Sequence, residues 1–120
     1  MIILRTRRYS FNGQMITKII EKLDKDRVED YEVVKKIPSD VISISSDLNS
    51  VCIFIPKEYE YSQYDIDDFI RSLSPMLRTR TSYDRNIFVM KLNTPLKLDQ
   101  FCKIVKYISE EWEFCSIVED

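Results

Sequence analysis

The feature that most constrains this chain is its scarcity of glycine and alanine, because one of its 120 residues is glycine and none is alanine. Close approach of two backbones needs small side chains. We therefore expect the helices to pack through large side chains onto a sheet, which the many branched and aromatic residues favour. A single glycine, Gly13, also excludes a glycine-rich phosphate-binding loop.

Three stripes of apolar residues, each spaced i, i+3, i+4, i+7, predict three amphipathic helices. The stripes lie within residues 14–25, 64–73 and 95–111. We expect Ser62 to cap the second helix, and Thr94 to cap the third with Pro95 at its first position. Runs rich in β-branched residues predict strands over 31–37, 41–46, 51–55, 77–83, 87–92 and 113–118. Prolines, or turns that contain Asp and Asn, separate several of these runs.

These elements predict a single α+β domain over residues 1–120. We expect a two-layer sandwich, in which an antiparallel sheet of about six or seven strands carries three helices on one face. Residues 1–12 form a basic extended arm or edge strand in this interpretation. The expected core consists of Ile16, Ile20, Leu23, Ile42, Ile44, Phe69, Ile70, Phe101 and Val105.

Two stretches of the sequence resemble each other and suggest an internal duplication. Residues 53–55 and 66–70 read Ile-Phe-Ile and Ile-Asp-Asp-Phe-Ile, and residues 87–89 and 98–102 read Ile-Phe-Val and Leu-Asp-Gln-Phe-Cys. This pattern predicts two ββα repeats over residues 41–74 and 77–110. The alternative is chance similarity, since any two amphipathic units share an apolar pattern.

Several kinds of catalytic and metal chemistry are excluded by composition. The chain has no histidine, so Ser–His and Cys–His catalysis and His-based metal sites cannot occur. Cys52, Cys102 and Cys115 form no C-x-x-C pair and are odd in number, so we expect buried thiols rather than disulfides or zinc ligands. We therefore expect no enzyme activity, no cofactor and no metal.

The acidic run Asp65, Asp67 and Asp68 has two interpretations. Two carboxylates at i and i+3 share a helix face and could bind Mg²⁺ or divide acid and base roles. Carboxylates are also favoured in the first turn of a helix by its dipole. We prefer the second interpretation, because it accounts for all three residues.

A basic segment supports nucleic-acid binding as an alternative function. Residues 69–91 carry five basic residues against one acidic residue, and Arg78, Arg80 and Arg85 are the candidate phosphate contacts. The formal net charge of −2 argues against it, because nucleic-acid binders concentrate positive potential over a whole face.

Charge segregation and clustered tyrosines favour protein binding as the main function. Residues 1–12 contain three arginines and no acidic residue, whereas residues 110–120 contain five acidic residues and no basic one. Such blocks suit association with a charged protein surface or with a second copy of the chain. The candidate binding residues are Arg5, Arg7, Arg8, Tyr59, Tyr61 and Tyr64.

Two of these binding assignments have a structural alternative. The tyrosines suit a contact surface, since tyrosine offers a large area at low entropic cost, but their alternation also suits an edge strand. The arm of residues 1–12 could add to a partner's sheet, although pairing within its own sheet is the interpretation we favour.

The expected setting is intracellular. The apolar residues 1–4 are followed at once by arginines, which is unlike a signal peptide, and no apolar run is long enough to span a membrane. Residues with AT-rich codons abound, which suggests a gene from a low-GC bacterium or its phage. We therefore expect a small phage-type accessory protein, cytoplasmic or in a virion, that binds a protein, a second copy of itself or a larger particle.

Overall fold

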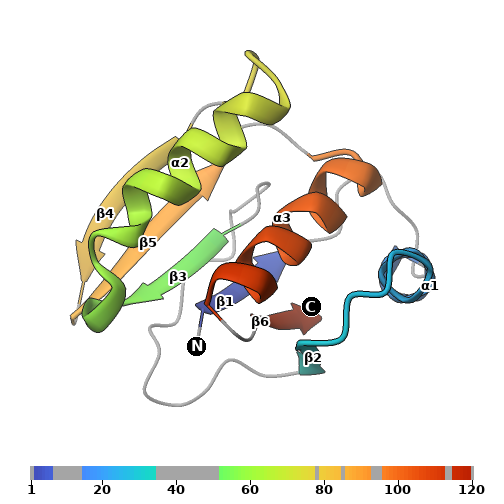
Figure 1. Cartoon of the computed structure of the whole chain (residues 1–120). Coiled ribbons are helices and arrows are strands. Elements are labelled where there is room, and N and C mark those ends of the chain that lie inside the picture. The colour runs from blue at the N-terminus through green and yellow to red at the C-terminus, as the bar shows by residue number, and fades with distance from the viewer. Residues whose placement is uncertain are drawn as a thin grey trace.

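A computed structural model of the chain describes residues 2–6, 15–34, 52–77, 79–84, 86–92, 96–112 and 115–119 (Figure 1). Within these ranges the chain forms three α-helices, one 3-10 helix and one six-stranded sheet. The elements in chain order are β1 (Ile2–Thr6), α1 (Met15–Lys25), β2 (Tyr31–Val34), β3 (Cys52–Pro56), η1 (Lys57–Tyr59), α2 (Ser62–Leu73), β4 (Thr79–Asp84), β5 (Ile87–Leu92), α3 (Leu98–Glu111) and β6 (Cys115–Glu119). The α+β class and the three helices are as the sequence predicted, and the strand expected over 41–46 lies outside the described residues.

The sheet is mixed, so the expectation of a purely antiparallel sheet was wrong. Its strand order is β2-β6-β1-β3-β5-β4. Antiparallel pairing joins β1, β3, β5 and β4, but β6 runs parallel to both β1 and β2. The reason lies in the connections, because α1 and α3 carry the chain back across the sheet so that the next strand runs in the same direction as the last.

The first strand lies in the interior of the sheet and is neither an arm nor an edge strand. Within β1, Ile3 stands opposite Phe54 of β3 on one side and Ser116 of β6 on the other. Its residues Ile2, Ile3 and Leu4 are all buried. Three consecutive apolar side chains point to alternate faces, so they are all buried only where both faces of the strand are covered.

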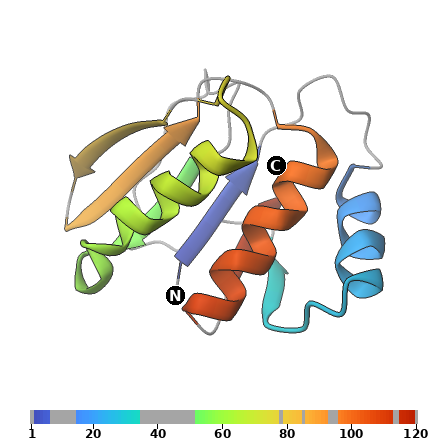
Figure 2. The same ribbon diagram turned by 45° about the horizontal axis from the view of Figure 1, so that its top comes forward.

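One face of the sheet packs against all three helices. The core on this face joins inward side chains of β1, β3, β5 and β6 to those of α1, α2 and α3. The helix residues buried here are Ile19, Leu23, Ile66, Ile70, Phe101, Cys102, Ile104, Val105 and Ile108. Figure 2 shows α3 between α1 and α2, and it packs against both helices. Large side chains therefore separate the helices, as the scarcity of glycine and alanine predicted.

The expected core residues are partly confirmed. Leu23, Ile70, Phe101 and Val105 are buried, and Ile16 and Phe69 are partly buried against the same core. Ile20 is only half-buried, because Ile19 takes the inward position on α1. The other two, Ile42 and Ile44, lie outside the described residues.

The opposite face of the sheet also carries a buried apolar cluster. It contains Ile3, Cys52, Phe54, Val89 and Val118, and no residue of the described helices belongs to it. The central strands thus bury both faces, which explains why they read as continuous apolar runs rather than as a clean alternation. The two-layer arrangement of the whole chain stays a prediction.

The proposed duplication is only partly covered by the described residues. β3 is followed by α2, β5 is followed by α3, and β3 and β5 are antiparallel neighbours. The first strand of the first repeat lies outside the described ranges. The ββα duplication over residues 41–74 and 77–110 therefore stays a prediction, as does the single-domain assignment.

Replacing Phe101 with alanine tests the packing of α3 on the sheet. Phe101 is fully buried among residues of all three helices and the sheet. We expect Phe101→Ala to lower the free energy of unfolding by about 3–5 kcal/mol in a urea titration, because it leaves a cavity. Tyr61→Ala, at an exposed position, serves as the control and should change this quantity by about 0.5 kcal/mol or less. Equal effects of the two substitutions would contradict this packing.

Candidate functional site

The predicted tyrosines lie where β3 leads into α2, and two of the three are exposed to solvent. Tyr61 and Tyr64 are 77% and 64% exposed. Tyr59 ends η1, is partly buried and packs against the core. The edge-strand interpretation of these tyrosines was wrong, because the chain here turns from a 3-10 helix into an α-helix.

A row of exposed side chains covers the side of α2 that faces away from the core. Ile66 and Ile70 define the inward side, since both are fully buried. Tyr61, Tyr64, Asp65 and Asp68 are exposed, and their spacing of i, i+3, i+4 and i+7 places them on one side of the helix. We call these four residues the α2 outer face.

Three aromatic rings in contact join the C-terminal half of α2 to the end of α3. The rings of Phe69 and Tyr107 are parallel, with centroids 4.0 Å apart, and Trp112 meets Tyr107 edge-on at 5.6 Å. Such ring pairs stabilise by about 0.5–1.5 kcal/mol beyond the area that they bury. These rings therefore join α2, which carries the outer face, to α3.

Ser62 adds a hydrogen bond to this support and does not cap the helix. It is the first residue of α2, the N-cap position is Tyr61, and no side chain caps that end. The Ser62 hydroxyl instead accepts a hydrogen bond from Trp112 Nε1 at 2.9 Å. The capping prediction was wrong because a partner 50 residues away in sequence uses the hydroxyl.

The surroundings of Tyr107 are electrically negative. The pKa of its phenol is raised, mainly by burial and then by the carboxylates of Asp65, Glu111 and Asp68. These acids come from both α2 and α3. The junction of the two helices is therefore a region of negative potential next to the exposed tyrosines.

A third exposed tyrosine is held at the turn of the β4–β5 hairpin. Tyr83 is 52% exposed, and its hydroxyl donates to Asn86 Oδ1 at 2.7 Å. Lys57 Nζ donates to the Tyr83 hydroxyl oxygen at 3.5 Å. The Lys57 ammonium also sits 5.6 Å from the centre of the Tyr83 ring. These contacts fix the hairpin beside η1 and use the polar end of Tyr83.

The three aspartates of α2 do not converge on one point. Asp67 is bound to Arg71 Nε at 3.0 Å and accepts a hydrogen bond from the Thr79 hydroxyl, which ties α2 to β4. Asp65 and Asp68 are exposed on the outer face instead. Among the described residues, no group of three or more His, Cys, Asp or Glu side chains is placed to hold a metal ion.

Of the predicted arginines only Arg5 is described, and its backbone lies at the opposite end of β3 from the tyrosines. The backbone of Arg5 stands opposite Cys52 at the beginning of β3, whereas Tyr59, Tyr61 and Tyr64 follow the end of that strand. Residues 7 and 8 lie outside the described ranges, so Arg7 and Arg8 are not placed.

Only one of the predicted nucleic-acid contacts lies in the described part of the chain. Arg80 is an exposed residue of β4 and stands opposite Lys91 of β5. Directly opposite residues of paired strands share a face, so these two cations are neighbours there. Arg78 and Arg85 lie outside the described ranges.

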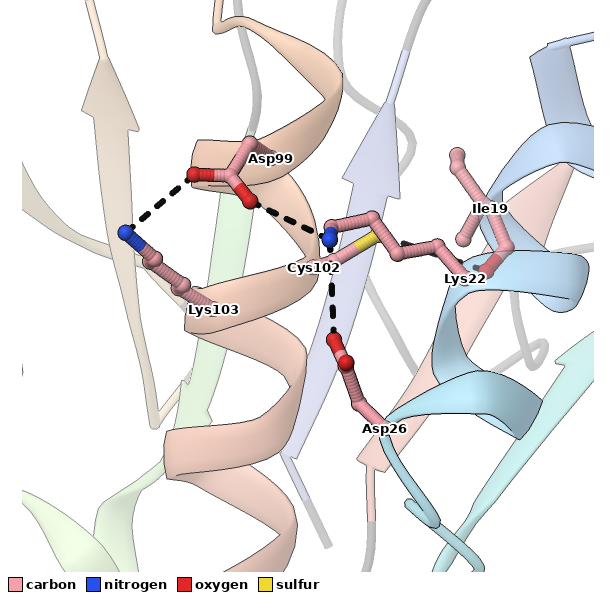
Figure 3. Close-up of polar contacts among 6 residues, drawn as sticks. All are labelled: Ile19, Lys22, Asp26, Asp99, Cys102 and Lys103. Carbon is pink, nitrogen blue, oxygen red and sulfur yellow. Dashed lines mark hydrogen bonds and ion pairs between the residues drawn. The ribbon is translucent and has the colours of Figure 1, made fainter.

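A second polar cluster, at the contact of α1 with α3, is best explained as structural (Figure 3). Lys22 lies 3.2 Å from Asp99 and 3.7 Å from Asp26, and Asp99 lies 3.2 Å from Lys103. The hydrogen bond to Asp99 raises the pKa of Lys22, and the hydrogen bonds from Lys103 and then Lys22 lower the pKa of Asp99. The charges balance within the cluster, so it joins two helices and leaves no charge for a ligand.

The thiol beside this cluster is not a nucleophile at neutral pH. Cys102 is buried, and its Sγ lies 4.0 Å from the Ile19 carbonyl oxygen. Burial raises the pKa of this thiol to about 11, and only the thiolate is reactive. All three cysteines are buried, as the sequence predicted for small apolar residues.

Comparison with known proteins adds no relative. No family model, no curated protein and no solved structure matches this chain. In the described part of the chain, no helix combines the length and the apolar character needed to cross a membrane.

Sequence reasoning missed the residues that support the outer face. Tyr107 belongs to α3, and Trp112 is the C-cap of that helix. Their partners Phe69 and Ser62 lie on another helix, and no local spacing links positions so far apart. The one available signal was that a tryptophan tends to find a hydrogen-bond acceptor when it is buried.

The hydrogen bond between Trp112 and Ser62 can be tested by removing its acceptor. We expect Ser62→Ala to lower the free energy of unfolding by about 0.5–1.5 kcal/mol. It should also shift the emission of the single tryptophan, since the indole loses a partner. Ser72→Ala, at an exposed position on the same helix, should leave the emission unchanged. An unshifted spectrum in Ser62→Ala would contradict the contact.

The burial of Cys102 predicts a loss of stability in alkaline solution. Its thiol pKa is about 11 in the folded chain against an ordinary value of 9.0. A raised pKa contributes stability that is present below the ordinary value and is lost as the pH rises toward the folded value. We expect the free energy of unfolding to fall over this pH interval. In the Cys102→Ala variant the same quantity should fall less steeply with pH. Equal slopes, measured by urea titration at several pH values, would contradict this.

Proposed function

We propose that this protein is a non-enzymatic protein-binding module, and that the α2 outer face is its contact surface. The observation that carries the proposal is the exposure of Tyr61 and Tyr64, at 77% and 64%, at a helix end that a hydrogen bond from Trp112 to Ser62 ties to the end of α3. Large aromatic side chains exposed in this way are typical of contact residues, which become buried when a partner binds.

The contacts between α2 and α3 make the α2 outer face suitable for binding. The ring contacts of Phe69, Tyr107 and Trp112 attach α2 to α3. A surface that is ordered before binding loses less conformational entropy in the complex, so more of the contact energy appears as affinity. Tyrosine adds to this effect, because it has few rotatable bonds for its area.

The chemistry of the described residues supports a binding role over a catalytic one. The chain has no histidine to serve as a base. The Cys102 thiol stays protonated at neutral pH because burial raises its pKa to about 11. Asp67 is engaged by Arg71 and Thr79, so it holds the fold together.

The partner in this proposal is a protein, either another chain, a second copy of this one or a component of a larger particle. The AT-rich codon usage implied by the composition supports a phage-type accessory protein, either in the cytoplasm or in a virion. Arg5 lies at the far end of β3 from the tyrosines. The proposed surface therefore rests on Tyr61 and Tyr64 rather than on the arginines of residues 1–12.

The test compares two exposed apolar sites at opposite ends of α2. The Tyr61→Ser, Tyr64→Ser double variant removes the proposed anchors, and Met76→Ser alters a residue that is 74% exposed beyond the other end of the helix. Each protein is used for affinity purification from cells of the organism that encodes it, and captured proteins are quantified.

We expect the tyrosine variant to lose its partner by about 30-fold or more, since a contact anchor contributes about 2 kcal/mol or more. Met76→Ser should retain the partner. All three proteins should unfold at the same temperature. Retention of every captured protein by the tyrosine variant, or equal loss in the Met76 variant, would refute the proposed surface.

A further inference from the structure

We propose that the α2 outer face recognises a positively charged segment of its partner, one that carries arginine or lysine side chains. This inference rests on the proposed function and adds the chemistry of the partner. It follows from the placement of the acidic residues around the exposed tyrosines.

Each tyrosine of the α2 outer face has an aspartate one helical turn further along. Asp65 follows Tyr61 and Asp68 follows Tyr64, both at i, i+4, a spacing that places side chains next to each other on a helix. All four are exposed. The outer face therefore repeats one unit, an aromatic ring beside a carboxylate.

Within the described residues, neither of these aspartates is neutralised by an ion pair. The ion pairs there engage Asp67 with Arg71, Asp26 with Lys22, and Asp99 with Lys22 and Lys103. Asp65 is explained in part by the dipole at the start of α2. Asp68 lies beyond the first turn, where the dipole no longer favours a carboxylate.

Two more carboxylates are placed where they disfavour the local helix. Glu110 and Glu111 are exposed in the last turn of α3, which contains no basic residue. Acidic side chains at a helix C-terminus meet the negative end of its dipole and destabilise it. Residues that oppose the fold in this way are expected at functional surfaces. Glu111 acts together with Asp65 and Asp68 on Tyr107, so the acids of the two helices lie close together.

Tyrosine rings next to carboxylates match the chemistry of a guanidinium or ammonium group. The cation rests on the face of the ring, and a carboxylate beside the ring accepts its hydrogen bonds. The protein already contains half of this arrangement at the β4–β5 turn, where the Lys57 ammonium lies 5.6 Å from the centre of the Tyr83 ring. Charge complementarity of this kind mainly selects the partner and speeds its association.

The experiment uses the full chain with a hexa-arginine peptide as the probe. The single tryptophan, Trp112, packs on Tyr107 and is bonded to Ser62 at the foot of the outer face. Its fluorescence therefore reports binding at this place. We expect a saturable change with the arginine peptide that weakens as salt is added, and no change with hexa-glutamate.

Matched variants separate the outer face from overall charge. Asp65→Asn with Asp68→Asn should weaken arginine-peptide binding by about 10-fold, equivalent to about 1.4 kcal/mol. Glu21→Gln with Glu29→Gln removes the same net charge from exposed positions on and just after α1, and should bind like the original chain. No fluorescence change, or equal weakening in both variants, would overturn the inference.

A second measurement separates failure of this inference from failure of the proposed function. The Asp65→Asn, Asp68→Asn variant is used in the affinity purification described above. If it keeps the captured partner at the original level while the tyrosine variant loses it, the partner is not recognised by charge and only the present inference fails. If the tyrosine variant also keeps the partner, the proposed function fails as well.

Discussion

The insertion of β1 between β3 and β6 is the constraint on which the rest of the structure depends. On one side of β1 lie β3, β5 and β4, and each of these described strands runs antiparallel to its neighbour. On the other side lie β6 and β2, which both run parallel to β1. β1 therefore joins two sheet halves of different kinds. Its side chains also belong to both apolar clusters, since Ile2 and Leu4 face the helices and Ile3 faces the other way.

The third helix has a comparable role among the helices. It lies between α1 and α2 and contacts both (Figure 2). On one side Lys22 and Asp99 link it to α1, and on the other Tyr107 and Trp112 link it to α2. The chain has one glycine and no alanine, and lysine and aromatic side chains make most of these contacts. The aromatic contacts join α2, which carries the outer face, to α3.

Local elements were predictable from the sequence, and their arrangement was not. The i, i+3, i+4 stripes located the three helices because amphipathic periodicity is a property of neighbouring residues. The position of β1 and the parallel pairing of β6 depend on partners that are distant in the chain, about which periodicity carries no information. The run of Ile2, Ile3 and Leu4 was the one hint, since an edge strand rarely buries both faces. Of the three predicted binding tyrosines, Tyr61 and Tyr64 are exposed, whereas Tyr59 packs against the core.

The interior position of the first strand has a consequence for how the chain folds. The partners of β1 are β3 and β6, and β6 begins at Cys115, more than a hundred residues later in a chain of 120. In the described sheet, β6 is also the strand that joins β2 to the rest. Contacts between such distant segments form slowly, because a long loop must close before they contribute. During synthesis on the ribosome, β1 and β2 must therefore wait for the last strand to emerge, and the apolar residues of β1 stay without one of their two neighbours until then.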